Sequence, residues 1–241
     1  MKPTDIQPRL NHAATTLQTQ LELACPPIAL AFREKPPEGI PRISTPGPAG
    51  CSYWKLASEG QVFYTEASDH YACPIGSHTH GIELPEDTAK ELEGLVQTMV
   101  GIQYIRKEDI AKIPRREKPF HVALYAPLAE APFEPDVILV RGSVKQLMVL
   151  VEAVQAAGRT HTTSVMGRPT CAAVPEAIQS GGVITSLGCI GNRVYTGLGD
   201  DEAYLTLPVI HLHEVCGKLG ALVEANRQLE SFHRSRLPVN S

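Results

Sequence analysis

Four of the chain's cysteines are placed so that they could share one chemical site. The chain has six cysteines among 241 residues, and in a reducing compartment cysteines serve metal binding, catalysis or packing rather than disulfide bonds. Cys51 and Cys73 occupy the first half of the chain, and Cys171 and Cys189 occupy the second. Four thiolates are a donor set that suits an iron–sulfur cluster or a zinc ion.

The stretches that begin at the first cysteine of each pair resemble each other. In CSYWKLASEG (51–60) and CAAVPEAIQSGG (171–182), an alanine follows the cysteine by six residues and glycine follows soon after. A β-like run and a second cysteine come next in both cases. We interpret this order as a diverged internal repeat with sub-repeats at 24–113 and 120–217. Coincidence among small residues is the alternative.

The second cysteine of each pair keeps a fixed spacing to a glycine. Cys73 lies eight residues before Gly81, and Cys189 lies eight residues before Gly197. We expect both segments to be loops. If a pseudo-twofold axis relates the two halves, equivalent loops converge near it. The repeat therefore predicts one site whose metal ligands are Cys51, Cys73, Cys171 and Cys189.

The cysteine spacing favours an iron–sulfur cluster, of the 4Fe-4S type, over zinc. The paired cysteines are 22 residues apart in the first half (51 to 73) and 18 apart in the second (171 to 189). Structural zinc takes its cysteines as close pairs two to four residues apart. Cysteines that are far apart in the sequence therefore weaken the zinc assignment without excluding it. Zinc, haem and the absence of a cofactor remain as alternatives.

Glycines beside the cysteines fit the same hypothesis. Peptide N–H groups aimed at sulfur stabilise a cluster, and glycine lets the backbone approach without an interfering Cβ. Gly76, Gly188 and Gly191 are therefore the predicted cofactor-binding residues. The alternative is that these are ordinary tight turns and that cysteine fills core space as a small hydrophobic residue.

Two arginines flank the second cysteine pair. Arg168 and Arg193 could hold a carboxylate or phosphate group of a substrate, or offset the charge of a cluster. Cys25 and Cys216 have no counterparts in the repeat, and we interpret both as packing residues.

Two further features of the first cysteine loop are candidates for chemistry. His78 and His80 would point the same way in an extended segment and could form a metal or proton-transfer pair, although surface histidines in a loop are commoner. Cys73-Pro74 is similar to short haem-binding motifs, but no Cys-x-x-Cys-His motif is present.

These residues leave three functions open. The first is an iron–sulfur protein, either a cluster-dependent enzyme or a redox protein, that acts on a small anionic substrate. The second is a metal-free protein with a reactive thiol for sulfur transfer or redox chemistry. The third is a module that binds a small ligand or haem. The phosphate-loop, dinucleotide-binding, zinc-protease and serine-hydrolase motifs are all absent.

The elements that must position these residues alternate between helix and buried strand. An N-terminal helix at 5–23, a Pro- and Gly-rich loop at 35–50 and a C-terminal helix at 209–233 frame the pattern. Between them, strands are expected at 28–32, 61–66, 121–127 and 136–142. Helices are expected at 51–58, 84–101 and 143–157. The strands are continuously apolar, as in a sheet covered on both faces. We predict an α/β or α+β fold, in a single compact domain spanning 1–241.

Composition narrows the class of partner. The formal net charge is −4, with 22 Lys+Arg against 26 Asp+Glu, which does not favour nucleic acid. The first twenty residues lack the apolar run of a signal peptide, and no later segment suits a membrane helix. We expect a cytoplasmic protein whose partner is a small molecule or a redox protein, with a homo-oligomer left open.

The quoted stretches resemble one known family. PIALAF, CSYWKLASEG, ACPIG, PDVILVRG and above all SLGCIGNRVYTGLGDDEAYLTLP are similar to the uncharacterised ArCR family over about 20–217. The resemblance implies that the four paired cysteines, with Arg193, occupy the positions that the family uses. It implies no settled activity, so function must be argued from the site. Pro74 and the histidines at 78 and 80 depart from the family pattern.

Overall fold

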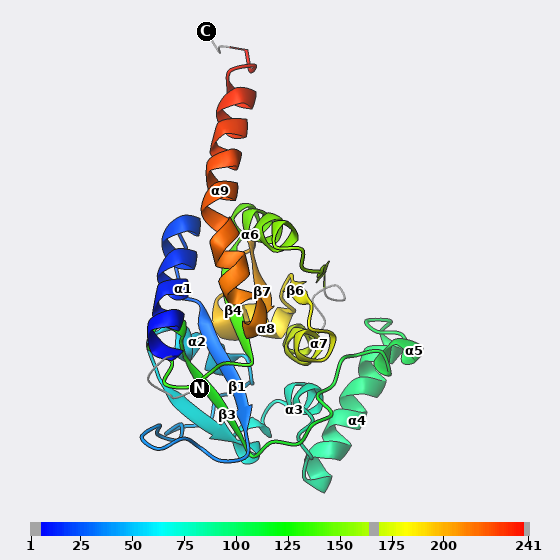
Figure 1. The fold of residues 1–241 in the computed structure, drawn as a ribbon. Coiled ribbons are helices and arrows are strands. Elements are labelled where there is room, and N and C mark those ends of the chain that lie inside the picture. Colours follow the sequence, from blue (N-terminus) through cyan, green and yellow to red (C-terminus); the bar gives the residue numbers. More distant parts are fainter. Residues whose placement is uncertain (1–5, 164–168, 239–241) are drawn as a thin grey trace.

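A mixed seven-stranded sheet forms the centre of the computed structural model, which describes residues 6–163 and 169–238 (Figure 1). The strand order is β2-β3-β1-β4-β7-β6-β5. All neighbouring strands pair antiparallel except β5 and β6, which are parallel. The strands are β1 (Ile28–Arg33), β2 (Phe63–Glu66), β3 (Val122–Pro127), β4 (Val137–Ser143), β5 (His161–Thr163), β6 (Val183–Ser186) and β7 (Glu202–Pro208).

The central strands are buried on both faces, as their unbroken apolar sequences predict. Every residue of β3 is buried, as are the first five of β1 and the first four of β4. Successive side chains alternate between the faces, so each strand contributes to two separate cores. The α/β fold with terminal helices is therefore confirmed.

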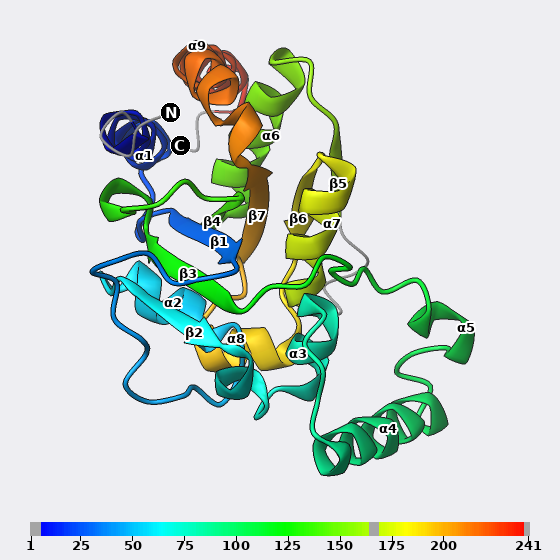
Figure 2. The same cartoon turned by 60° about the horizontal axis from the view of Figure 1, so that its bottom comes forward.

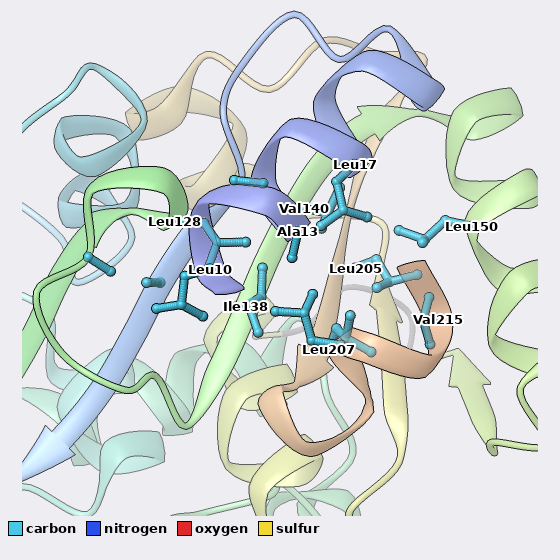
Figure 3. Close-up of a cluster of buried hydrophobic side chains, with 14 of the residues drawn as sticks. Leu10, Ala13, Leu17, Leu128, Ile138, Val140, Leu150, Leu205, Leu207 and Val215 are labelled. Atoms are coloured by element: carbon cyan, nitrogen blue, oxygen red, sulfur yellow. The ribbon is translucent and has the colours of Figure 1, made fainter. Parts of the chain in front are cut away.

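One face of the sheet is covered by α1 (Ile6–Leu21), α6 (Val144–Ala156) and α9 (Val209–Arg234) (Figure 1). Their apolar side chains meet those of the strands in the cluster that Figure 3 shows, including Leu17, Ile138, Leu150, Leu205 and Val215. None of the described helices is long and apolar enough to cross a membrane.

The other face is covered by the helices that follow the cysteines. These are α2 (Ser52–Ser58), α3 (Pro74–His80), α7 (Ala173–Ser180) and α8 (Ile190–Thr196), which lie on the side of the sheet opposite α1 and α9 (Figure 2). The second core includes Tyr53 and Trp54 from α2 and Val174 from α7, with Cys51 and Cys171 packed against it. The cysteines therefore belong to this face.

Two helices stand apart from the sheet. The predicted helix at 84–101 forms as α4 (Glu86–Gly101), and α5 (Lys107–Ile110) follows it at the edge of the molecule (Figure 2). No residue of α4 is buried. Hydrophobic periodicity predicted the helix correctly but not its position.

Both halves of the sheet carry elements in the same order. Residues 28–127 run β1, α2, β2, α3, β3, with α4 and α5 inserted between α3 and β3. Residues 137–208 run β4, α7, β6, α8, β7, with α6 and β5 inserted after β4. In each half a cysteine lies just before, or in the turn that leads into, the helices α2 and α3 or α7 and α8. The strand order β2-β3-β1 is mirrored by β4-β7-β6. The internal repeat itself stays a prediction.

Candidate functional site

Each of the four paired cysteines lies at the start of a helix. Cys51, Cys73 and Cys189 are the residues immediately before α2, α3 and α8. Cys171 lies in the 3-10 turn Thr170–Ala172, which leads into α7. The first N–H groups of a helix have no partner within it, so this placement brings free backbone donors near the cysteines, although the Cys51 and Cys73 side chains accept no capping hydrogen bond.

The equal spacing from cysteine to glycine has a structural cause. The segments from Cys73 to Gly81 and from Cys189 to Gly197 are not loops, as the sequence suggested, but seven-residue helices. Each cysteine is the N-terminal cap, and each glycine is the C-terminal cap in the left-handed region, with φ of 75° and 67°. Glycine adopts this conformation without steric cost, so helix length fixes the eight-residue step.

Tyr53 ties the two cysteines of the first half together. Its hydroxyl accepts a hydrogen bond from Gly47 N–H over 3.0 Å, within the loop that leads to Cys51. The same hydroxyl donates to the backbone carbonyl of Asp69. The neighbouring carbonyl, of His70, accepts from Cys73 N–H over 2.9 Å.

A threonine joins the two cysteines of the second half. Cys189 N–H donates to the hydroxyl of Thr170 over 2.5 Å, and Thr170 directly precedes Cys171. Asn192 N–H donates to Cys189 Sγ over 3.4 Å. A helix N–H therefore reaches one of the four sulfurs directly.

Cys73 and Cys189 lie close enough to Cys51 and Cys171 to add to the rise in the pKa of those two thiols. Burial raises the pKa of Cys51 to about 12, with further contributions from Cys73 and Cys189. Burial likewise raises the pKa of Cys171, and Cys73, Cys189 and Cys51 add to the shift. Across the halves, α2 contacts α8, and α3 contacts the turn that carries Cys171. The structure thus brings all four cysteines into one region.

Buried polar atoms near the thiols lack protein partners at good hydrogen-bond geometry. Among the described residues, neither polar side-chain atom of Asn192 nor the hydroxyl of Tyr125 reaches good hydrogen-bond geometry, although Asn192 is 1% exposed and Tyr125 fully buried. The Asn192 amide does interact with the Cys51 thiol, and the Thr65 hydroxyl with Tyr125, and each interaction opposes the rise in the pKa of its partner. Asn192 lies beside Cys51, and Cys51 and Cys171 both help to raise the pKa of Tyr125 after burial. Buried polar groups are hydrogen-bonded as a rule, so these atoms indicate a bound group or water.

The predicted glycines differ in how closely they approach other atoms. A Cβ added at Gly76 would lie 2.8 Å from Cys73 Sγ, so this position requires glycine while the sulfur keeps its place. Gly188 has a φ of 83°, and a Cβ there would lie 2.5 Å from Leu198. A Cβ on Gly191 would meet nothing closer than 3.8 Å. Their cofactor-binding role stays a prediction.

The four thiols do not enclose a single metal position. In residues 6–163 and 169–238, no group of three or more histidine, cysteine, aspartate or glutamate side chains could hold one metal ion. A zinc ion needs each sulfur about 2.3 Å from its centre. Binding of zinc or of an iron–sulfur cluster by these thiols stays a prediction.

The predicted histidine pair does not form. His78 and His80 lie in α3 rather than in an extended segment, so residues two apart point in different directions. His80 is 1% exposed, and burial lowers its pKa to about 3, with contributions from His70 and Arg116. Pro74 occupies the first position of α3, where its fixed φ favours a helix start. The helix start accounts for the Cys73-Pro74 pair without haem.

Arg193 is engaged with the backbone around α8. Its guanidinium donates to the carbonyl oxygens of Gly199 and Leu187, each over 2.6 Å. These bonds connect the turn before Cys189 to the loop after the helix. Arg168 lies outside the described residues. A role for either arginine toward a substrate or a cluster stays a prediction.

Several polar residues at the site escaped the sequence analysis. His70 stands three residues before Cys73, and Asn192 stands three residues after Cys189, so closeness to the cysteines was the available signal. The sequence around Tyr53 gave no signal of a role at the site beyond the aromatic character of the residue. Arg116 belongs to the charged run PRREKP, which is typical of a solvated connector, yet it is 8% exposed.

Of the two remaining cysteines, Cys216 lies away from the site, whereas Cys25 and Cys51 both help to raise the pKa of Tyr204 after burial. Cys216 is in α9, packed against the core of the opposite face, and burial raises its pKa to about 12. It lines a groove of about 370 Å³ between α1 and α9. Cys25 precedes β1 and is partly buried.

Comparisons with known proteins identify a family but no activity. No solved structure matches the chain. An uncharacterized protein of Methanocaldococcus jannaschii, MJ0308, is 29% identical over 155 residues, which cover 61% of this chain and 65% of the archaeal protein. The match thus spans less than two thirds of that relative's length. The model of the uncharacterised ArCR family matches residues 16–218, as the sequence resemblance predicted, and the chain belongs to that family.

Proposed function

We propose that this chain binds an iron–sulfur cluster, of the 4Fe-4S type, through Cys51, Cys73, Cys171 and Cys189. The observation that carries the proposal is the approach of these four thiols, which come from distant parts of the chain, to one region. Four thiolates are the usual ligand set of such clusters. The protein would serve as a redox protein or as a cluster-dependent enzyme in a reducing compartment such as the cytoplasm.

The surroundings of the thiols support a bound anionic centre. A cluster held by four thiolates carries negative charge and is stabilised by N–H donors around its sulfurs. The helix starts at the four cysteines supply such donors, and Asn192 N–H already contacts Cys189 Sγ. The buried Asn192 amide, which interacts with the Cys51 thiol, is a further donor.

The ionisation of Cys51 and Cys171 disfavours a reactive-thiol role for those two cysteines. A nucleophilic cysteine needs a lowered pKa, whereas burial and neighbouring thiols raise the pKa of Cys51 and Cys171. Thiols in such surroundings become thiolates when a metal supplies the opposing positive charge.

Anaerobic purification of the full chain tests the proposal. We expect a brown protein with about four iron and four sulfide per chain, as a 4Fe-4S centre requires. Serine replacements at each of the four positions, Cys51→Ser, Cys73→Ser, Cys171→Ser and Cys189→Ser, should each lower the iron content. Cys216→Ser is the matched control, because that thiol is also partly buried but lies on the other face.

Three results would overturn the proposal. The first is anaerobically prepared, folded protein without iron. The second is one zinc per chain, measured by mass spectrometry of the metals, in place of iron and sulfide. The third is loss of iron from Cys216→Ser equal to the loss in the four site variants.

A further inference from the structure

Arg116 is a buried cation without a counter-ion of its own. It is 8% exposed, and within the described part of the chain its Nε and Nη1 atoms have no hydrogen-bond partner. Its guanidinium carbon lies 4.7 Å from the ring centroid of Phe32 and 5.1 Å from that of Phe120. The rings offer some stabilisation, but burying an unpaired charge is costly unless an anion accompanies it.

His80 lies beside Arg116, and its side chain also lacks hydrogen-bond partners among the described residues. Neither ring nitrogen of His80 has a hydrogen-bond partner among the described residues, and its ring centroid lies 5.5 Å from that of Phe32. The backbone N–H of Arg116 donates to the backbone carbonyl of Thr79 over 2.7 Å. The left-handed Gly81 permits this approach, since a Cβ there would lie 2.3 Å from the Arg116 carbonyl oxygen. The backbone therefore holds the two side chains together.

The nearby carboxylates have other partners. Asp136 and Glu34 are the acidic groups that act on Arg116 electrostatically. Asp136 forms an ion pair with Arg33 over 2.9 Å, and Glu34 lies 2.9 Å from a ring nitrogen of His121. Among the ion pairs of the described residues, none includes Arg116, so its buried N–H groups remain available.

We propose that Arg116 and His80 form a binding subsite for a small organic carboxylate. The guanidinium supplies the positive charge and in-plane N–H donors, and the imidazole supplies a further N–H. Phe32 and Phe120 flank the guanidinium with apolar rings, which suit the carbon part of such a ligand better than the hydration shell of a phosphate.

The subsite adjoins the four-cysteine site. The ring centroid of His80 lies 6.0 Å from that of His70, and His70 Nδ1 would lie 3.5 Å from a Cβ on Gly50, the residue before Cys51. The subsite therefore lies near the loop that carries Cys51. This inference goes beyond the iron–sulfur proposal and does not depend on it, because anion binding can be measured whether or not metal is present.

Thermal unfolding of the full chain in different anions tests the subsite. Sodium acetate, propionate and benzoate are compared with sodium chloride and phosphate at constant ionic strength, on protein with and without iron. A carboxylate at a hundredfold excess over its Kd should raise the unfolding midpoint by about 5–10 °C. Arg116→Met should abolish this rise, whereas Arg115→Met, at the exposed neighbouring position, should keep it.

The outcomes separate ligand binding from a packing role. If Arg116→Met fails to fold, Arg116→Lys and His80→Gln serve instead, and both should weaken the carboxylate response. A wild-type protein with no saturable rise in any carboxylate overturns the proposal, as does an equal rise in Arg116→Met or an equal response to phosphate. A response to carboxylates in iron-free protein supports the subsite even if the cluster proposal fails.

Discussion

A Cβ added at Gly76 would lie 2.8 Å from Cys73 Sγ, so the α3 backbone and the sulfur are closer than any other residue at position 76 allows. Alanine favours a helix over glycine by about 1 kcal/mol, yet here the new methyl group must displace the thiol. We therefore expect Gly76→Ala to lower iron incorporation on anaerobic purification, with a small effect on the free energy of unfolding.

Gly94→Ala in α4 is the control for this substitution. A Cβ on Gly94 meets no atom within 4 Å, so this variant should gain helix stability and keep its iron content. Equal iron content in both variants would mean that the position of the Cys73 thiol does not matter for metal binding.

Substitution of Asn192 tests whether its buried side chain contacts a bound group. Its amide is buried beside the Cys51 thiol and, among the described residues, has no partner at good hydrogen-bond geometry, so it stabilises the metal-free protein little. Asn192→Leu should leave the metal-free protein as stable as the wild type, or more stable by about 1–3 kcal/mol. The iron-loaded variant should lose iron faster in air, followed by its visible absorbance. A large destabilisation of the metal-free variant would contradict this assignment of the amide.

Local sequence rules predicted much of the fold because the interactions behind them are local. The helix after Ser143 is an example, since Ser143 Oγ accepts from Gln146 N–H over 3.3 Å and Gln146 Oε1 accepts from Ser143 N–H over 2.7 Å. The buried strands were predicted in the same way. The ordered recurrence of cysteines also singled out four thiols that the structure brings into one region.

Contacts between distant segments could not be read from the sequence. The pairing of Arg116 with His80 depends on the path by which the chain returns from α5 to β3, which no local pattern encodes. The segments after Cys73 and Cys189 were predicted as loops although they are helices. Seven residues are too few to give a helical periodicity signal in the sequence. The helix α4 shows the same limit, since periodicity predicts a helix but not that none of its residues becomes buried.

The ionisation of Cys51 predicts slow alkylation in the metal-free protein. Its pKa of about 12, raised mainly by burial, lies about three units above that of a free thiol. At pH 8 the thiolate population, and with it the iodoacetamide rate, should be on the order of a thousandfold below that of an unstructured cysteine peptide. The rate should keep rising up to pH 11. Mass spectrometry of peptides follows each thiol, and fast labelling of Cys51 at pH 8 would favour the metal-free reactive-thiol function.

The ion pair between Arg141 and Glu202 predicts an acid-dependent loss of stability next to α8. Glu202 Oε2 accepts from Arg141 Nε over 2.9 Å and from Gly199 N–H over 2.7 Å. Burial alone would raise the pKa of Glu202, but these hydrogen bonds outweigh it and lower the pKa. The carboxylate therefore stabilises the fold fully above its unfolded pKa of about 4.3, and this contribution is lost as pH falls through the lower folded value.

Urea unfolding at a series of pH values tests whether the contribution of Glu202 to stability is lost as the pH falls. Glu202→Gln should lower the free energy of unfolding by about 1–3 kcal/mol at pH 7, the range for a hydrogen-bonded charge. The difference from wild type should shrink as the pH drops below about 4. Glu224→Gln removes an exposed ion pair with Arg227 and should change stability by less than about 1 kcal/mol at any pH. A Glu202→Gln difference that stays constant from pH 7 to pH 3 would show that the lowered pKa does not contribute to folding.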